Sequence, residues 1–318
     1  MKRILMVIML FVLTGTARAA DLANIGVSTA VLRLGGGVRS GGMADVCAGV
    51  YGGLDSLYGN PAGLRVDGPE FGVRYNTLFG EVNVGSFSFA NSYKFGNLGA
   101  SLLYLNYGAI DKIDESGIIT GSFAPFDILA TVSYSRKLGA DLSLGLSVKG
   151  FTEFIDSYNF GSVVLDAGAL YEVISEQLCV GLLIQNIGFN INGFQLPLNI
   201  KAGAAYSVNG LLAENKSKIK VFKRGQGNIS AEKTDDHLTI ALDVELPSGE
   251  DPGVNAGLEY WYQDFAVRIG YKFRTGVYSS GGFTAGFGFK FAGYELNYAL
   301  VPYGELGISH NFSFVFNL

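Results

Sequence analysis

Side-chain alternation near the C-terminus is the feature that most constrains the fold of this chain. Between residues 281 and 318, three segments place an aromatic or aliphatic residue at every second position. The first segment sets Phe283, Ala285, Phe287, Phe289 and Phe291 against Thr284, Gly286, Gly288, Lys290 and Ala292. Because successive side chains of a strand point to opposite faces, each segment has one apolar face and one polar or small face. The pattern is typical of a transmembrane β-barrel, apolar outside and polar inside.

Similar alternating segments, separated by short turns, follow one another from Phe71 onward. They predict an all-β fold, a transmembrane antiparallel β-barrel of about 14 strands, an even number as expected for a bacterial single-chain barrel. The strands are expected near residues 71–79, 82–94, 97–108, 126–138, 140–152, 161–173, 177–188, 196–208, 237–247, 253–263, 265–274, 280–292, 293–301 and 304–317.

Composition supports a membrane protein that crosses with strands. Mean hydropathy is high at +0.28, while only 16% of residues are charged. After the N-terminus, no apolar window is long enough for a spanning helix, and the longest candidates are interrupted by Gly and Asn. A closed barrel then remains, because every backbone polar group in hydrocarbon must be paired. The net charge of −5 gives no reason to expect a nucleic-acid partner.

The N-terminus has the pattern of a secretory signal peptide. Lys2 and Arg3 precede an apolar stretch, residues 4–13, and the small residues Ala17 and Ala19 follow at the spacing of a cleavage site. Residues 1–20 are therefore predicted to be removed. The alternative, a spanning N-terminal helix, would need about 20 apolar residues.

Charged residues in the predicted strands fall on the inward side of the alternation. An Arg or Lys at the lipid midplane would cost about 2–4 kcal/mol, so this distribution fixes which face is outside. We interpret the inward charges as lining a hydrated lumen. The candidate lumen-facing residues are Lys149, Asp166, Lys201, Asp243, Glu259, Arg268, Lys290 and Glu295.

Turn lengths also differ between the two ends of the predicted barrel. One end has short turns, and the other has longer loops at 109–125, 153–160 and 189–195. Short periplasmic turns and long outer loops are usual for such barrels. The long polar segment 209–236 breaks the rule on the periplasmic side. It fits either a solvated loop with a short hairpin or a docking surface for a periplasmic partner.

Two stretches resemble a known family. Residues 41–48 and 55–64, ending in Asn-Pro-Ala-Gly-Leu, resemble the N-terminal segment of the PorV/PorQ family, relatives of the FadL-type outer-membrane transporters. Residues 254–271, 283–288 and 296–310 resemble the family's C-terminal run. Together the stretches cover under half of the predicted mature chain. The candidate motif residues are Gly41, Gly42, Asp55, Asn60, Pro61, Ala62, Gly63 and Leu64.

The resemblance implies a 14-stranded barrel in the bacterial outer membrane, with residues 21–70 as a plug inside it and residues 71–318 as the barrel. Within the motif, Asp55 is expected to cap a helical turn over residues 56–59, which Asn60 ends because it precedes Pro61. The motif either seats the plug alone or also contacts a substrate.

No enzymatic or metal-binding signature stands out, and no cofactor is expected. His237 and His310 are the two histidines, and neither lies in a recognisable catalytic or metal motif. Cys47 and Cys179 are too few for a disulfide framework. They fit either one disulfide or two free thiols, since both are expected to face the interior.

These observations predict a non-enzymatic outer-membrane barrel surrounded by lipid. As FadL relatives do, it would pass a small hydrophobic molecule through a plugged lumen. The alternative, by analogy with PorV-type relatives, is a secretion-associated scaffold or shuttle that binds exported proteins. A hydrolase is the least supported reading, because no catalytic triad is apparent.

Overall fold

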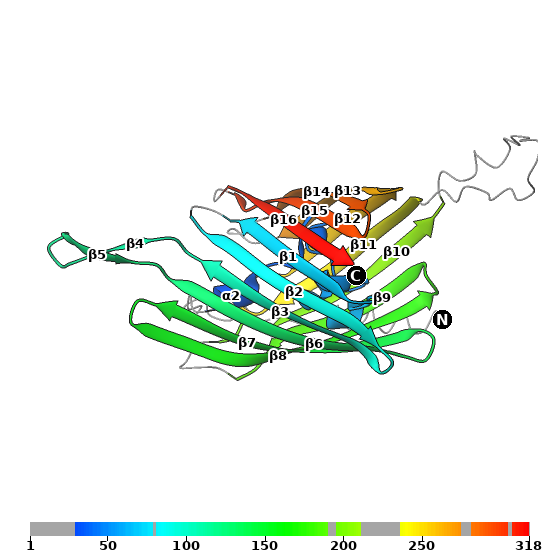
Figure 1. Ribbon diagram of the computed structural model, residues 1–318, viewed down its shortest axis with the longest axis horizontal. Coiled ribbons are helices and arrows are strands. Elements are labelled where there is room, and N and C mark those ends of the chain that lie inside the picture. Colours follow the sequence, from blue (N-terminus) through cyan, green and yellow to red (C-terminus); the bar gives the residue numbers. More distant parts are fainter. Residues whose placement is uncertain are drawn as a thin grey trace, which may run out of the picture.

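Fourteen antiparallel strands close into a barrel in the computed structural model (Figure 1). The structure describes residues 29–78, 81–189, 195–210, 236–274, 281–304 and 307–317. The barrel strands are β1 (Glu70–Thr77), β2 (Asn83–Tyr93), β3 (Gly96–Asn106), β6 (Phe126–Leu138), β7 (Leu142–Ile155), β8 (Tyr158–Ile174), β9 (Leu178–Ile187), β10 (Asn199–Asn209), β11 (Asp236–Pro247), β12 (Gly253–Tyr262), β13 (Phe265–Arg274), β14 (Gly282–Phe291), β15 (Tyr294–Pro302) and β16 (Ile308–Asn317).

Each strand pairs with its neighbour in sequence, except that β3 pairs with β6, and β1 pairs with β16 to close the cylinder. The predicted antiparallel barrel and its strand number are confirmed. Between β3 and β6, strands β4 (Ile110–Ile113) and β5 (Ile119–Phe123) form a separate hairpin that projects beyond the rim (Figure 1). We call that rim the hairpin end. The opposite rim, where β1 begins and β16 finishes, is the terminal end.

The loops differ from prediction in two places. The region 109–125 contains the β4–β5 hairpin, which was not predicted. The expected loop at 153–160 is wrong, because β7 continues to Ile155 and β8 begins at Tyr158. The turn residue Asp156 has a φ of 53°, and backbone pairing runs past the point where apolar alternation ends. Residues 190–194 and 211–235 lie outside the described residues, so the predictions for them are not tested.

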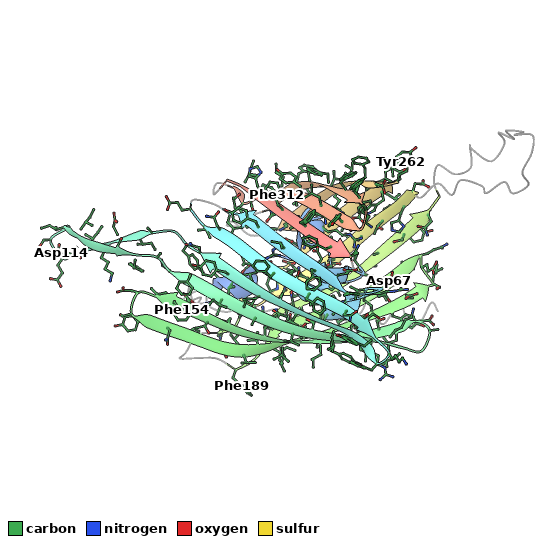
Figure 2. The ribbon with its side chains drawn as sticks, in the orientation of Figure 1. Asp67, Asp114, Phe154, Phe189, Tyr262 and Phe312 are labelled. Carbon is green, nitrogen blue, oxygen red and sulfur yellow. The ribbon has the colours of Figure 1, made fainter. Side chains whose placement is uncertain are left out.

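The outer face of the barrel is apolar and exposed. Phe87 is 69% exposed, Phe265 62% and Val132 58%, whereas Ser133, next to Val132 in the chain, is fully buried. Aromatic rings pair across neighbouring strands, with centroids 4.7 Å apart in both Phe71–Phe89 and Phe265–Phe289. Phe312 and Tyr262 belong to this outer surface (Figure 2). Soluble proteins rarely expose so much contiguous apolar area, so this face suits hydrocarbon.

Residues 29–69, which we call the inner segment, lie within the barrel (Figure 1). They form four short helices: α2 (Ala30–Arg33), α3 (Val38–Gly41), η2 (Gly53–Leu57) and η3 (Pro61–Gly63). η3 contacts β7 and β8 on one side of the wall, and α3 contacts β15 on another. No helix among the described residues is long and apolar enough to cross a membrane.

The predicted signal peptide, residues 1–20, lies outside the described residues, as do residues 21–28. The expected boundary at residue 20 therefore stays a prediction. So does the division of the chain at residue 70 into plug and barrel, although β1 begins at Glu70.

Candidate functional site

Glycines on the inner face of the wall let the inner segment lie directly against the backbone of the strands. A Cβ atom added at Gly145, Gly168 or Gly181 would overlap Ala62, Asn60 or Ala48, respectively. On the opposite wall, a Cβ at Gly257 would lie 2.6 Å from the Met43 carbonyl oxygen, and one at Gly270 would lie 2.5 Å from the Ala44 nitrogen. The absence of side chains at these strand positions is therefore what makes room for the inner segment.

Asn60 fixes the turn that carries the Asn-Pro-Ala-Gly-Leu motif. Its backbone is extended, as expected before Pro61, and its Oδ1 accepts a hydrogen bond from the Ala62 N–H at 3.0 Å, which caps η3. Its Nδ2 donates to the Ala48 carbonyl at 2.7 Å. Asn60 is 1% exposed, so this side chain is satisfied by the inner segment itself. These contacts hold the motif in place between strands β7 and β8.

The remaining motif residues are also buried against the wall. Pro61, Ala62 and Gly63 form η3, and Leu64 packs with Leu54 and other apolar side chains near the terminal end. In a separate region, a Cβ at Gly42 would lie 3.2 Å from the Gly286 Cα of β14, and one at Gly41 would lie 3.6 Å from Val301 on β15. The two parts of the motif thus lie against different sides of the barrel.

The predicted capping role of Asp55 is wrong. Asp55 lies inside η2, whose N-cap is Gly52, so its side chain cannot cap that helix. Its Oδ2 instead accepts a hydrogen bond from the Ser40 N–H at 3.2 Å, which joins η2 to α3. Burial raises the pKa of Asp55, although the Ser40 hydrogen bond and the nearby Arg39 oppose this effect. Sequence spacing could not show this contact, because it joins two turns of the inner segment.

The eight candidate lumen-facing charges are mostly paired, and six of them are buried. Lys149 and Asp166 form an ion pair of 2.5 Å, and Lys201 lies 2.8 Å from Glu245. Lys290 and Glu295 lie 3.6 Å apart near the terminal end, where the Lys290 side chain is 52% exposed. These pairs lie under or beside the inner segment, so the expectation of charges lining an open, hydrated lumen is not met for the buried ones.

Glu259 is the centre of the largest buried ion cluster. Its carboxylate accepts from Arg268 at 2.6 Å on the neighbouring strand and from Arg39 of the inner segment at 2.7 and 2.9 Å. Glu259 and Arg268 are both fully buried. A buried carboxylate that serves two guanidinium groups stabilises the contact only while all partners are present. Arg39 thereby fixes α3 to β12.

Two further charges hold the inner segment. The Asp243 carboxylate of β11 accepts hydrogen bonds from the backbone N–H groups of Cys47 and Ala48 at 2.8 and 2.9 Å. Asp45 forms an ion pair with Lys272 of β13. Burial alone would raise the pKa of Asp45, but Lys272 and Lys201 outweigh it and the net pKa lies below the ordinary value.

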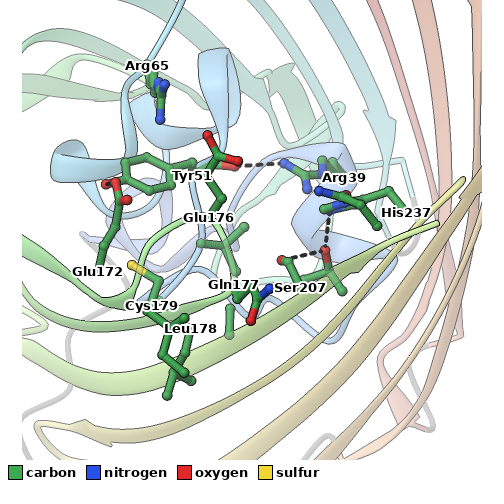
Figure 3. Close-up of a pocket in the computed structure, with 16 residues that line it drawn as sticks. Arg39, Tyr51, Arg65, Glu172, Glu176, Gln177, Leu178, Cys179, Ser207 and His237 are labelled. Carbon is green, nitrogen blue, oxygen red and sulfur yellow. Dashed lines mark hydrogen bonds between the residues drawn. The ribbon is translucent and has the colours of Figure 1, made fainter. Parts of the chain in front are cut away.

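A polar cavity of about 330 Å³ lies at the terminal end, between the inner segment and the wall (Figure 3). Side chains from the inner segment and from β8 to β11 surround it. Its charged and aromatic lining comprises Arg39, Tyr51, Arg65, Glu172, Glu176 and His237. The Tyr51 hydroxyl donates to Glu172 at 2.9 Å. This cavity is polar on most sides and suits water or a polar solute.

The hairpin end of the lumen is apolar. We call the buried cluster there the apolar chamber: Val31, Leu32, Val84, Leu103, Leu105, Leu129, Phe151, Val164 and Leu196. Its wall residues come from the hairpin-end halves of β2, β3, β6, β7 and β8, and Val84 and Val164 are fully buried. The inner segment contributes the two side chains from α2. The lumen is therefore apolar towards one end and polar towards the other.

Sequence reasoning missed several of these residues. Arg39 and Asp45 lie in a segment without alternation, so no pattern indicates which side they face. Asp127 has inward parity but stands at the start of a strand, and Glu153 was placed in a predicted loop. Alternation extended by two or three residues would have placed both inside the barrel.

The cysteines and histidines carry no reactive arrangement in the described part of the chain. Cys47 and Cys179 are free thiols, so of the two predicted alternatives the disulfide is wrong. Burial raises the pKa of the Cys47 thiol to about 12. His237 contacts Asn209 and Thr239, and His310 contacts Tyr298. No group of three or more acidic, His or Cys side chains among the described residues could hold a metal ion.

Comparison with known proteins gives a fold but no family. No family model and no curated protein sequence matches the chain. Among solved structures, the toluene transporter TbuX of Ralstonia pickettii has a TM-score of 0.61 at 11% identity, covering 89% of this chain and 98% of its own. The toluene transporter TodX of Pseudomonas putida has a TM-score of 0.58 at 15% identity, covering 90% and 99%. The monoaromatic hydrocarbon channel CymD has a TM-score of 0.54 at 13% identity, covering 89% and 98%.

These proteins share the closed barrel over nearly their whole length. At such low identity the likeness concerns the fold alone.

Proposed function

We propose that this protein is a non-enzymatic outer-membrane channel that admits a small hydrophobic molecule through the apolar chamber, with the inner segment as its plug. The observation that carries the proposal is the apolar chamber itself, a buried cluster at one end of a lumen whose middle and other end are polar. An apolar solute partitions into such a chamber and is excluded from bulk water. The similar solved structures include toluene transporters, which supports this substrate class.

The apolar outer face supports a location in the membrane. Its exposed side chains would pack against lipid, and the strands leave no unpaired sheet edge because β1 closes on β16. The signal-peptide pattern of residues 1–20 supports export, and a barrel of this type then belongs in a bacterial outer membrane.

We also propose membership of the PorV/PorQ family on the two sequence stretches described above. The buried, mutually bonded Asn60 and η3 support a seating role for the Asn-Pro-Ala-Gly-Leu motif rather than direct contact with a substrate.

Toluene uptake tests the channel function. Cells whose outer membrane has a lipopolysaccharide outer leaflet should take up toluene faster when they produce the protein than with an empty vector. Leu103→Asn, inside the chamber, should lower this gain severalfold, because an unpaired amide costs about 1–3 kcal/mol in apolar surroundings. Leu102→Asn is the matched control, since Leu102 is 53% exposed on the outer face and Leu103 only 1%. Equal uptake with the protein and with the empty vector would contradict the proposal.

The projecting hairpin favours a second function, a scaffold for exported proteins. Ile113, Ile118 and Ile119 are 64%, 62% and 61% exposed on it, and Figure 2 shows Asp114 at its tip, beyond the rim. A two-stranded hairpin is marginally stable alone, so a partner would stabilise it. Exported proteins should then co-purify with the intact chain and be lost when residues 109–124 are replaced by a short Gly-Ser linker. Co-purification that is unchanged by this replacement would contradict the scaffold function.

A further inference from the structure

Two carboxyl groups face each other in the apolar chamber. Asp127 of β6 and Glu153 of β7 are directly opposite in the strand pairing, and they are 0% and 3% exposed. Side chains opposite each other in an antiparallel pair have Cβ atoms about 4.5–5.5 Å apart. Leu129 and Phe151, the next inward residues on the same two strands, belong to the apolar chamber. The two acids therefore form part of its wall at the hairpin end.

These carboxyl groups lack partners that a buried acid needs. The Tyr107 hydroxyl donates to Asp127 Oδ2 at 2.7 Å, but Asp127 Oδ1 and Glu153 Oε2 are buried without a hydrogen-bond partner. No Lys or Arg among the described residues forms an ion pair with either group. Burying negative charge without a cation is costly, so a cation that entered this place would be strongly favoured.

The basic side chains of the neighbouring lumen are engaged elsewhere. Lys149, on the same strand as Glu153, pairs with Asp166 and donates to Asn186 at 3.1 Å. The Arg74 guanidinium lies over the Tyr58 ring at 4.2 Å from its centroid and donates to the Gly36 carbonyl. The two acids are therefore left for a cation from outside the protein.

The surroundings indicate what kind of cation fits. Two carboxyl groups are fewer ligands than a metal ion usually takes, and no larger cluster occurs among the described residues. The Phe151 and Phe160 rings lie with centroids 6.0 Å apart beside Glu153, and Tyr107 packs against the same cluster. Aromatic and aliphatic walls next to two acids match an ammonium group attached to an apolar body.

We propose that the apolar chamber selects small hydrophobic amines, with the ammonium group between Asp127 and Glu153 and the apolar body against Leu129 and Phe151. This inference rests on the proposed channel function and specifies its substrate. At present Val31 and Leu32 of α2 fill part of the chamber. α2 has four residues and no side-chain cap, so a ligand with its own apolar body replaces these side chains at modest cost.

The test compares three probes with one carbon skeleton: 2-phenylethylammonium, 2-phenylethanol and phenylacetate. Their binding to the purified full-length barrel in a non-ionic detergent is measured by equilibrium dialysis, with the micelle background subtracted. The ammonium probe should bind at least about tenfold more tightly than phenylacetate, because a charge-assisted hydrogen bond discriminates by at least that factor. Calcium at millimolar concentration should not displace it.

The double variant Asp127→Asn, Glu153→Gln keeps the shapes of both side chains and removes both charges. It should bring the ratio of ammonium to phenylacetate binding close to one, while 2-phenylethanol binding stays within about twofold. Glu295→Gln is the matched control, because Glu295 lies near the terminal end and should leave the ratio unchanged. Heat-modifiable gel mobility shows that each variant is folded.

The outcomes separate the inference from the function on which it rests. If 2-phenylethanol binds but the ammonium probe binds no better than phenylacetate, or the ratio survives in the double variant, the amine selectivity is overturned and the channel stands. Displacement of the ammonium by calcium would make the acids a metal site and also overturn it. If none of the probes binds and toluene uptake is at the empty-vector rate, the proposed function itself fails.

Discussion

A Cβ atom at position 181 would overlap the carbonyl oxygen of Ala48, so Gly181 of β9 and Ala48 of the inner segment are in direct backbone contact. The contact leaves no space for any other residue at position 181. It lies near the Asp243 carboxylate that accepts from the Ala48 N–H, so one peptide of the inner segment is held from two strands.

Gly181→Ala should therefore displace the inner segment. Overpacking of this kind costs about 1–3 kcal/mol of the free energy of unfolding. Gly150→Ala is the control, because an added Cβ there meets nothing within 4 Å. Unfolding by urea in phospholipid vesicles, followed by the fluorescence of the single tryptophan, Trp261, gives both values. Equal stability of the two variants would show that the close approach has no energetic consequence.

Removing the charge of Glu259 should destabilise the protein far more than removing that of Glu295. Glu259→Gln leaves Arg39 and Arg268 without their counter-ion in a buried place, which costs about 3–5 kcal/mol. Glu295→Gln breaks a 3.6 Å pair with the half-exposed Lys290 and should cost less than about 1 kcal/mol. The same urea titration measures both. A small loss for Glu259→Gln would mean that Arg39 does not hold α3 to the wall.

The Asp45–Lys272 pair predicts a pH dependence. The pKa of Asp45 in the folded protein lies below its ordinary value of 3.8, because Lys272 and Lys201 outweigh the effect of burial. The folded state thus binds fewer protons than the unfolded state, and the stabilisation is present above about pH 4 and lost as the pH falls through the lower folded pKa. Wild type should be more stable than Asp45→Asn at pH 7, and the difference should shrink below pH 3.8. A difference that grows on acidification would contradict this sign.

Charge on the outer face should block assembly. Phe287 is 47% exposed on β14, and Phe287→Arg should cost about 2–4 kcal/mol and reduce folding into vesicles, as should Leu144→Arg. A milder effect was expected for the inward changes Ser143→Arg and Gly288→Arg, but the structure makes Gly288 a poor control, since a Cβ there lies 2.9 Å from Arg268. Ser207→Arg, which enters the polar cavity, is the better control. Equal damage from Phe287→Arg and Ser207→Arg would contradict the assignment of faces.

Alternation predicts the barrel well because the two faces of each strand meet different solvents. The strand β14, for example, was expected at residues 280–292 and occupies Gly282–Phe291. The β4–β5 hairpin escaped prediction because it lies beyond the membrane, where Asp111 and Lys112 interrupt any apolar face. Glu153 escaped for a similar reason, since its strand continues past the apolar region.

The inner segment was predictable in kind but not in detail. Its glycines and the Asn-Pro-Ala-Gly-Leu motif indicate close packing, yet no periodicity shows that Arg39 reaches Glu259, 220 residues away. The acid pair in the chamber depends on the register between β6 and β7, which single strands do not reveal. Long-range contacts of this kind are set by tertiary packing, whereas local patterns set the strands.

The most direct test of the account is a crystal structure of the full-length protein soaked with 4-bromotoluene. The account predicts an anomalous bromine peak inside the apolar chamber, against Leu103, Leu129 and Phe151, with α2 displaced or moved aside. Bromine peaks confined to the outer, lipid-facing surface, with the chamber unchanged, would contradict it.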